Sequence, residues 1–442
     1  MIHTHRLNEA EYTQNFADIH PPFETHEGAS IEANRCLFCY DAPCTKSCPT
    51  SIDVPKFIKQ IATENIKGAA KTIFDSNIMG AGCSRVCPVE KLCEGACVYN
   101  LLHESPIAIA RLQRYATAPA LENNWQFYSS PSEKSKKVAV VGAGPAGLAC
   151  AHALAQKGVA VSIFEKEPKG GGLMTYGVAG YKVTPEFCEE EVQWILGVGG
   201  IDIQYGVELG KDVQLADLQA QYDAVFLAIG VGVARPLQIE GEALDGVVNA
   251  ISFIYDIRTK DLAAIPVGDA VAVIGMGMTA IDAATQAKRL GAKKVTMIYR
   301  RTENEKPCTD AELDLARLDG CEIIWLAAPH HINGQDGKVT EIVCSEMVLG
   351  EPDASGRRSP VDTGHTFTLP VDMVIKATGQ LPYRNLLSEV GVQFSNETHD
   401  SGSTNLKGVF AGGDCVNGGK EVVDAVQAGK VAAASICDYL FG

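Results

Sequence analysis

The sequence contains no long apolar segment and no excess of positive charge. Its first residues, MIHTHRLNEAEYTQNF, include no apolar core of a signal peptide, and no eighteen consecutive apolar residues occur anywhere. These absences predict a cytoplasmic protein without a membrane span. The formal net charge of −16 at pH 7 argues against nucleic acid as a partner, because phosphate recognition needs basic patches.

A second feature is missing from the larger part of the chain. After residue 137 no two cysteines are spaced as C-x2-C or C-x4-C, so we expect no redox-active cysteine pair there. The cysteines of this part are isolated in the sequence, and we expect them to be ordinary buried thiols. They are Cys150, Cys188, Cys308, Cys321, Cys344, Cys415 and Cys437.

Eight further cysteines are concentrated in two short stretches, CLFCYDAPCTKSC at 36–48 and CSRVCPVEKLCEGAC at 83–97. A disulfide framework is not expected, since cytosolic thiol pools keep such pairs reduced. Zinc prefers paired ligands that complete one tetrahedron, whereas most of these spacings are irregular. Proline follows Cys48 and Cys87, as it follows the last cysteine of bacterial ferredoxin runs. The pattern favours iron–sulfur clusters and leaves zinc as the alternative.

The chain changes character along its length. Residues 1–35 are polar and hold four histidines in no metal-binding spacing, so a solvated arm is expected. Residues 54–74 carry apolar side chains at helical intervals, with Gly68 interrupting the pattern, which predicts a small helical domain around the cysteines. The polar stretch SSPSEKSKK at 129–137 is typical of a linker.

Two similar units follow the linker, each a strand, a glycine turn, a helix and a second strand, at 137–165 and at 269–301. This internal repeat predicts an α/β fold with two Rossmann-like dinucleotide-binding domains, the second inserted in the first. The expected boundaries are a helical iron–sulfur domain at 1–128, an FAD-binding domain at 136–250 and 370–442, and an NAD(P)-binding domain at 251–369. Two nucleotide sites in one chain suggest one flavin and one nicotinamide.

The first glycine turn has every part of a dinucleotide fingerprint. Gly142 permits the tight turn, Gly144 lets the backbone approach a pyrophosphate, and Gly147 allows close packing of helix and strand. Pro145 and Ala146 complete the motif at the helix N-terminus, which faces phosphate charge. Glu165, at the end of the second strand, is placed to bind an adenosine ribose.

The second turn repeats this pattern and differs where the ribose is recognised. Its cofactor-binding candidates are Gly275, Gly277, Thr279 and Ala280. The following strand ends in Arg300 and Arg301, whose guanidinium groups suit a 2′-phosphate. Glu303 and Glu305 follow at once and would oppose that phosphate. The prediction is therefore NAD(H), with NADP(H) nearly as well supported.

Three later segments resemble parts of flavoproteins with two dinucleotide-binding domains. TNLKGVFAGGD at 404–414 resembles their second flavin motif, which implies that Gly413 and Asp414 bind the flavin, the aspartate at the ribityl chain. The helix after it would direct its N-terminus at the isoalloxazine. AIG at 228–230 and Ala377-Thr-Gly379 resemble the crossing points between the two domains of that fold. Cys415 is the only isolated cysteine expected near the flavin.

The chain from about residue 30 resembles the N-terminal half of dihydropyrimidine dehydrogenase, and more closely its separate bacterial subunit. The glutamate synthase small subunit is a more distant match. The resemblance lies in RCLFCYDAPCTKSCPTSIDVPKFI, GAAKTIF, CSRVCPVEKLCEGACV and SPIAIARLQRYAT. It implies two [4Fe–4S] clusters and leaves Cys83 without a ligand role. One cluster would take Cys36, Cys39, Cys44 and Cys97, and the other Cys48, Cys87, Cys93 and Gln113.

The same resemblance implies further cofactor contacts and a reaction. Gly172 and Leu173 match a GGL turn, Lys182 falls where the family has an arginine near the flavin, and Arg300 and Arg301 match a basic pair at the NADPH phosphate. Hydride transfer from nicotinamide to flavin needs no catalytic side-chain acid. The implied assembly is a hetero-oligomer, expected as a heterotetramer, with a partner that contains FMN and iron–sulfur clusters. It would interconvert uracil or thymine and the 5,6-dihydropyrimidine with NAD(H), and the alternative is a glutamate synthase small subunit or a related reductase.

Overall fold

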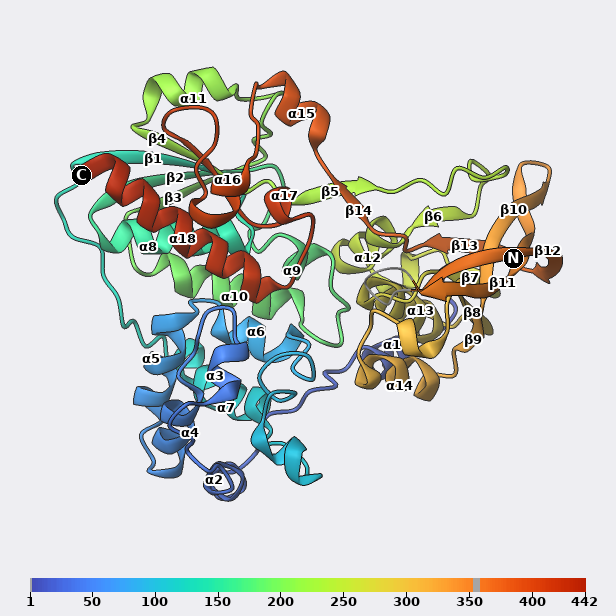
Figure 1. Cartoon of the computed structure of the whole chain (residues 1–442), viewed down its shortest axis with the longest axis horizontal. Helices are drawn as coiled ribbons and strands as arrows, with labels where there is room; N and C mark the ends of the chain where they lie inside the picture. Colours follow the sequence, from blue (N-terminus) through green and yellow to red (C-terminus); the bar gives the residue numbers. More distant parts are fainter. Residues whose placement is uncertain (1, 353–357) are drawn as a thin grey trace. The chain divides into compact units, whose positions relative to one another are not determined.

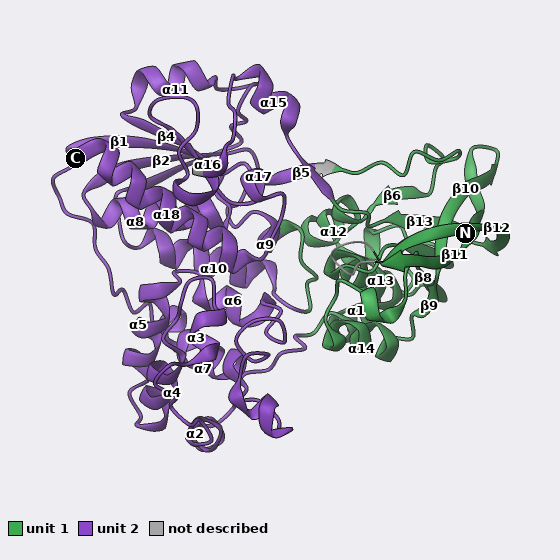
Figure 2. Cartoon of the chain, viewed as in Figure 1, with its two compact units in different colours: residues 1–17, 176–181, 234–379 green, residues 18–175, 182–233, 380–442 purple. Residues whose placement is uncertain are grey.

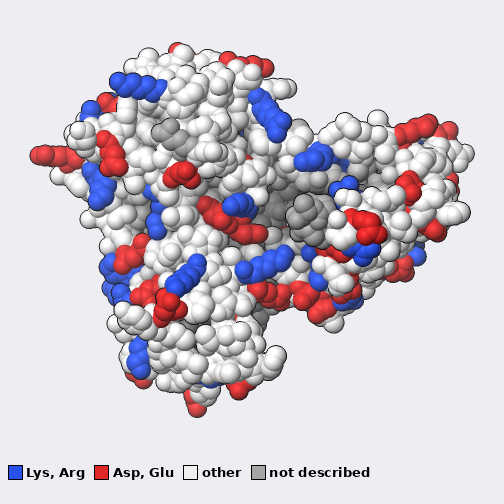
Figure 3. Space-filling view, in the orientation of Figure 1, with Lys and Arg blue, Asp and Glu red and all other residues white. Residues whose placement is uncertain are grey.

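The computed structural model describes residues 2–352 and 358–442, and the chain divides into two compact units (Figure 2). Unit 1 comprises 1–17, 176–181 and 234–379, and unit 2 comprises 18–175, 182–233 and 380–442. In the part of the chain that the structure describes, no helix has the length and apolarity needed to cross a bilayer. On the face drawn in Figure 3, acidic and basic side chains are interspersed over each unit.

The N-terminal part of unit 2 is a group of short helices (Figure 1). Asp53 and Asn65 accept hydrogen bonds from the first turns of α4 and α5, and the apolar faces of these helices bury Phe57, Ile61 and Ile73. The helices are α2 (His26–Asn34), α3 (Pro43–Ser47), α4 (Val54–Ala62), α5 (Ile66–Ser76), α6 (Gly80–Val86), η1 (Val98–Leu102) and α7 (Ile109–Glu122).

The expected interruption at Gly68 falls elsewhere. The helical pattern breaks between Ala62 and Ile66, and Gly68 lies inside the first turn of α5. The Asn65 side chain accepts a hydrogen bond of 3.0 Å from the Gly68 backbone amide. A Cβ at position 68 would lie 2.4 Å from the side-chain nitrogen, Nδ2, of Asn65. The glycine therefore makes room for the helix cap.

The rest of unit 2 is a parallel sheet with strand order β15-β4-β1-β2-β3. β4 is wholly buried and β1 is buried from Val138 to Val141. Helices α8 and α18 pack on this sheet (Figure 1). The strands are β1 (Lys136–Val141), β2 (Val159–Glu165), β3 (Ile201–Tyr205), β4 (Ala224–Leu227) and β15 (Val409–Ala411). The helices are α8 (Pro145–Gln156), α10 (Pro185–Leu196), α11 (Leu215–Gln221), α15 (Arg384–Glu389), α16 (Asn396–Ser401), α17 (Asp414–Asn417) and α18 (Val422–Phe441).

Unit 1 contains a second parallel sheet, order β6-β13-β7-β8-β9, and an antiparallel sheet, order β10-β11-β12. Its strands are β6 (Val247–Asn249), β7 (Ala270–Ile274), β8 (Lys294–Tyr299), β9 (Glu322–Trp325), β10 (Ala327–Gln335), β11 (Lys338–Pro352), β12 (Arg358–Pro370) and β13 (Met373–Lys376). Its helices are α1 (Glu9–Asn15), α12 (Ala250–Thr259), η2 (Leu262–Ala264), α13 (Met278–Arg289), η3 (Glu303–Glu305) and α14 (Asp310–Leu318). Short elements at the boundaries of the units are α9 (Leu173–Tyr176), β5 (Val231–Ala234) and β14 (Gln380–Pro382).

The unit boundaries differ from the expected domain boundaries. Residues 234–250 and 370–379 were expected in the FAD-binding domain, but they lie in unit 1 because β6 and β13 pair with each other and β13 pairs with β7. The helical iron–sulfur region and the first sheet, expected as separate domains, form one unit.

The first seventeen residues are not the solvated arm that the sequence suggested. Tyr12 is buried in the core of unit 1, where Ile2, Leu7 and Phe16 also pack. The Arg6 guanidinium pairs with the Asp269 carboxylate at 2.5 Å and donates hydrogen bonds to two backbone carbonyls. Only residues 18–35 of the expected arm belong to unit 2.

We expect the replacement Arg6→Ala to lower the free energy of unfolding of unit 1 by about 2 kcal/mol, the usual worth of hydrogen bonds to a charged group. Arg6 holds the pKa of Asp269 well below its ordinary value. The contribution should therefore be present above about pH 4 and decline as the solution becomes more acidic. Urea unfolding at pH 7 and at pH 3 measures both effects. Lys293→Ala, which removes a more exposed partner of the same carboxylate, should cost less than about 1 kcal/mol.

Candidate iron–sulfur and dinucleotide sites

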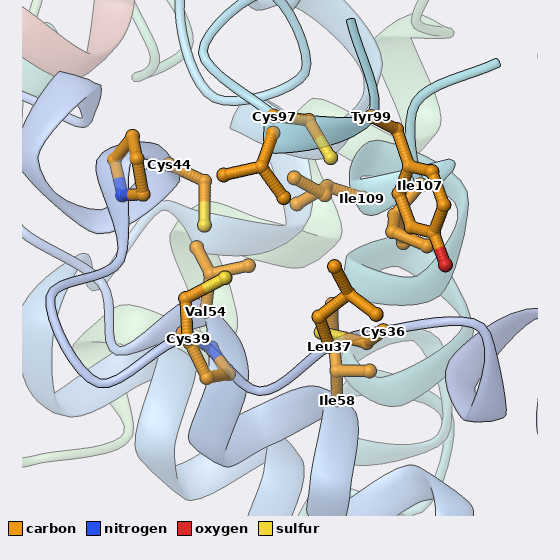
Figure 4. Close-up of a pocket in the computed structure, with 13 residues that line it drawn as sticks. Cys36, Leu37, Cys39, Cys44, Val54, Ile58, Cys97, Tyr99, Ile107 and Ile109 are labelled. Carbon is orange, nitrogen blue, oxygen red and sulfur yellow. The ribbon is translucent and has the colours of Figure 1, made fainter. Parts of the chain in front are cut away.

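Four cysteines line one pocket in the helical region of unit 2, which we call the first cysteine pocket (Figure 4). The Sγ atoms of Cys39, Cys44 and Cys97 point toward the same space in Figure 4. The pocket brings together a residue on α3, two residues before it and one at the start of η1. Its cysteines are Cys36, Cys39, Cys44 and Cys97, and its other walls are apolar, including Val54, Ile58, Ile107 and Ile109.

A second pocket lies in the same region and is lined by Cys48, Cys83, Cys87, Cys93 and Gln113. We call it the second cysteine pocket. Gln113 is 7% exposed, and its side-chain nitrogen donates a hydrogen bond of 2.6 Å to the Gly80 carbonyl. This bond leaves the amide oxygen as the atom that is suited to bind iron. The two predicted sets of ligands thus fall into two separate pockets.

Cys83, predicted to have no ligand role, also lines the second pocket and is buried. Its side chain is hydrogen bonded to Cys87, and this bond, followed by burial, raises the pKa of the Cys87 thiol. Five candidate donors therefore surround a site that needs four. Variants of Cys83 and Gln113 separate these two candidates for the fourth ligand.

The donor chemistry of both pockets suits iron–sulfur clusters. Among residues 2–352 and 358–442, no three His, Cys, Asp or Glu side chains converge on the position of one metal ion. The cysteines of a [4Fe–4S] cluster each bind a different iron, and each pocket offers at least four candidate donors around one space. Burial raises the pKa of Cys44 to about 11, and it raises those of Cys36 and Cys93 as well, so cluster binding must displace protons from these thiols.

The first glycine turn has the form that its sequence predicted. Gly142 has φ +103°, and a Cβ there would lie 2.4 Å from the Ala228 carbonyl oxygen. A Cβ on Gly147 would lie 1.9 Å from the Gly142 carbonyl oxygen. Gly144 is the N-cap of α8 and has no side-chain cap, so backbone amides remain for an anion. The turn therefore fits a pyrophosphate.

Glu165 lies at the end of β2, and its carboxylate supports the turn. One oxygen accepts a hydrogen bond of 2.6 Å from the Ala143 amide, and the other accepts one of 2.8 Å from the Glu167 amide. Burial raises the pKa of this carboxyl group. A ribose contact would use the remaining lone pairs of the same oxygens.

Two of the other predicted flavin contacts of unit 2, Gly172 and Gly413, lie beside this turn. A Cβ on Gly172, with φ +56°, would lie 2.9 Å from the Gly144 Cα, and one on Gly413 would lie 3.0 Å from the Ala146 Cβ. Asp414 begins α17 and accepts a hydrogen bond of 3.1 Å from the Lys420 amide, while burial raises its pKa. Leu173 begins α9 next to Gly172, and Lys182 is buried. Cys415, expected near the flavin, directly follows Asp414 and is buried, and its thiol donates a hydrogen bond to the Leu227 carbonyl.

The second glycine turn lies in unit 1. Gly275 has φ +131°, and a Cβ there would lie 2.4 Å from the Ala377 carbonyl oxygen, so the predicted crossing point adjoins the turn. Gly277 is the uncapped N-terminus of α13, and a Cβ at this position would meet no atom within 4 Å. This open space is what a bound pyrophosphate requires. Thr279 and Ala280 follow in the first turn of α13, and Gly379 has φ +95°.

The residues after β8 are the ones predicted to distinguish the ribose of NAD(H) from the 2′-phosphorylated ribose of NADP(H). Arg300 is exposed, and the Arg301 Nε donates to the Arg358 carbonyl. The two acids expected to oppose a phosphate have partners of their own. Glu303 forms an ion pair of 2.7 Å with Arg317, and Glu305 binds the Thr302 amide and hydroxyl. These contacts weaken the argument against NADP(H), and the choice of coenzyme remains a prediction.

The sequence motifs missed several charged residues of unit 2. Glu191 on α10 is wholly buried, and Asp18 forms ion pairs with Arg85 and Arg114. The available signal was helical periodicity, since Glu191 falls on the same face as Phe187, Cys188, Val192 and Ile195. Glu191 is thus an acid on an otherwise apolar helix face, which is visible in the sequence alone.

The fold and these sites define an oxidoreductase that uses FAD, a nicotinamide nucleotide and [4Fe–4S] clusters. Residues 12–125 match the model described as dihydropyrimidine dehydrogenase domain II, 4Fe-4S cluster. Residues 136–429 match the pyridine nucleotide-disulphide oxidoreductase model, and the chain belongs to this family.

Relatives from two functional groups are equally similar to the chain. It is 35% identical to the NAD-dependent dihydropyrimidine dehydrogenase subunit PreT of Salmonella typhimurium, over 97% of this chain and 98% of the relative. It is also 35% identical to the small chain of NADPH glutamate synthase of Escherichia coli, over 96% of this chain and 94% of the relative. Identity alone therefore does not make the glutamate synthase chain the more distant match.

A solved structure supports the fold. The chain is similar to Mycobacterium tuberculosis FprA in complex with NADPH, with a TM-score of 0.59 and 22% identity, over 70% of this chain and 85% of that one.

Proposed function

We propose that the chain is the electron-input subunit of an NAD-dependent dihydropyrimidine dehydrogenase in the cytoplasm. The supporting observation is the match of residues 12–125 to the model described as dihydropyrimidine dehydrogenase domain II, 4Fe-4S cluster. The 35% identity to the Salmonella subunit, over 97% of this chain and 98% of that relative, supports the same proposal.

In this proposal each pocket and turn has one task. The amides at the starts of α8 and α13 hold the pyrophosphates of FAD and of the nicotinamide nucleotide, and Asp414 holds the ribityl chain. When bound, FAD accepts electrons in pairs and the clusters carry them singly. Val423 at the start of α18 lines the second cysteine pocket, which supports placing that pocket next to the flavin. Leu37 and Tyr40, beside the first pocket, are exposed, which suits contact with a partner.

The partner is a subunit that carries FMN and further iron–sulfur clusters and reduces uracil or thymine. Expression with a genomic tag and purification of the resulting complex tests this proposal. We expect an FMN-containing partner and bleaching of the flavin by NADH more readily than by NADPH. A large partner with a glutaminase domain, together with a preference for NADPH, would contradict it.

A glutamate synthase small chain is the second candidate. It is supported by the 35% identity over nearly the whole length and by the name of that relative, which specifies NADPH. The ion pair of Glu303 with Arg317 also leaves Arg300 and Arg301 less opposed by negative charge. The same purification separates the two candidates, because the two partners differ in cofactor and in substrate.

A further inference from the structure

One carboxyl group of unit 2 is buried without full hydrogen bonding. Glu191 is 0% exposed, and its Oε1 accepts a hydrogen bond of 2.7 Å from the Gly82 amide. Its Oε2 is also buried and has no hydrogen-bond partner. A charged carboxylate in such a position is costly, so the group is poised to bind a proton.

Glu191 lies between the second cysteine pocket and the predicted flavin turn. A Cβ on Gly82 would lie 2.5 Å from the Glu191 Oε2 and 2.7 Å from the Met174 Sδ. Gly82 directly precedes Cys83 of the second pocket, and Met174 follows Gly172 and Leu173 of the GGL turn. A change of charge at the pocket therefore changes the electrostatic potential at the Glu191 carboxyl group, because the region between them is short and buried.

Charged groups connect this carboxyl group to the surface. Arg85 on α6 is partly buried, attracts Glu191 and contacts Asp18 at 3.3 Å, while Arg114 on α7 contacts the same carboxylate at 2.5 Å. His20 and Lys182 lie in the same group, and Cys188 on α10 faces the Met174 carbonyl. The Asp18 side chain is 31% exposed and so reaches solvent.

We propose that Glu191 takes up one proton from solvent when the cluster held in the second cysteine pocket gains one electron, and releases it when the electron leaves. The inference rests on the assignment of a cluster to that pocket. The electron comes from the reduced nicotinamide by way of FAD, the proton comes from water through the Asp18 group, and the O–H bond of Glu191 is the bond that forms.

The direction of the effect follows from burial. Burial raises the pKa of Glu191 to about 7, against the opposing influence of the Gly82 amide and Arg85. An added electron nearby raises this pKa further. Below about pH 7 the group holds its proton in both states, and above it the proton is gained only on reduction.

A redox titration of the purified flavoprotein, followed by the EPR signals of the two clusters from pH 6 to pH 9, tests the proposal. One cluster should show a midpoint potential that is level below about pH 7. Above that pH the midpoint potential should fall by about 59 mV per pH unit, which corresponds to a tenfold change in the equilibrium constant for one electron. The Glu191→Gln variant should show a level potential throughout. Glu190→Gln, an exposed neighbour on α10, should behave like the parent protein.

An equal slope in the parent and in Glu191→Gln, with both EPR signals present, would overturn the proposal. Loss of one EPR signal from the parent protein would instead show that the assignment of the second pocket has failed. The infrared difference spectrum of the unmodified protein on reduction is a second measurement that needs no stable variant. It should gain the C=O band of a protonated carboxyl group above pH 7, and its absence would contradict the proposal.

Discussion

Replacement of Gln113 by alanine is expected to reduce bound iron from about eight to about four atoms per chain, because a [4Fe–4S] cluster is then left without its fourth ligand. Gln113 is buried in the wall of the second cysteine pocket, with its amide nitrogen held by Gly80. Iron and sulfide analysis of anaerobically purified protein measures the loss. The FAD content, measured in the same sample, should be unchanged.

Two further variants separate a ligand from a packing residue. Cys83→Ser should keep about eight irons, although Cys83 lines the same pocket and is hydrogen bonded to Cys87. Gln113→Glu keeps an oxygen donor and should retain most of the second cluster. The opposite pattern, with iron lost from Cys83→Ser and kept in Gln113→Ala, would make Cys83 the ligand and refute the assignment.

A methyl group at position 147 is expected to weaken FAD binding by about 5- to 150-fold, since the Gly147→Ala Cβ would lie 1.9 Å from the Gly142 carbonyl oxygen. Overpacking of this kind costs about 1–3 kcal/mol, and 1.4 kcal/mol is tenfold in affinity. The displaced carbonyl belongs to the turn whose amides face the pyrophosphate. Flavin absorbance after desalting measures the retained FAD.

Gly28→Ala is the matched control for this glycine. Gly28 lies in α2, and a Cβ there would meet the Thr25 hydroxyl at 3.4 Å, an ordinary contact. We expect this variant to retain the parent level of FAD and of iron. Equal FAD content in Gly147→Ala and Gly28→Ala would show that the turn does not hold the flavin pyrophosphate.

The parts of the structure that were predicted from sequence depend on short-range requirements. The turns at Gly142 and Gly275 require positive φ and close backbone approach, which only glycine allows, so three or four residues are enough to identify them. The buried strands beside them are continuous apolar runs, as expected for parallel sheets covered on both faces.

The parts that were missed depend on contacts between distant residues. Arg6 is polar and near the N-terminus, and nothing close in sequence shows that its partner is Asp269. The expected NAD(P)-binding domain, 251–369, leaves out β6 and β13 for the same reason, because these strands join the parallel sheet of unit 1 through pairings between residues more than a hundred positions apart.

The cysteine site was predicted in part. Local spacing favoured iron–sulfur clusters over zinc, and the resemblance to a known family divided the ligands into the two sets that the fold brings into two pockets. The position of Cys83 in the second pocket could not be read from spacing, since it depends on how α6 packs against α7 and on the approach of Gln113.

The central claim, electron input to a pyrimidine-reducing partner, is tested most directly by the oxidation of NADH with uracil as the acceptor in the co-purified complex. We expect NADH to be consumed in proportion to the dihydrouracil formed, and we expect the partner alone not to react with NADH. Oxidation of NADPH that depends on 2-oxoglutarate and glutamine, with no response to uracil, would contradict it.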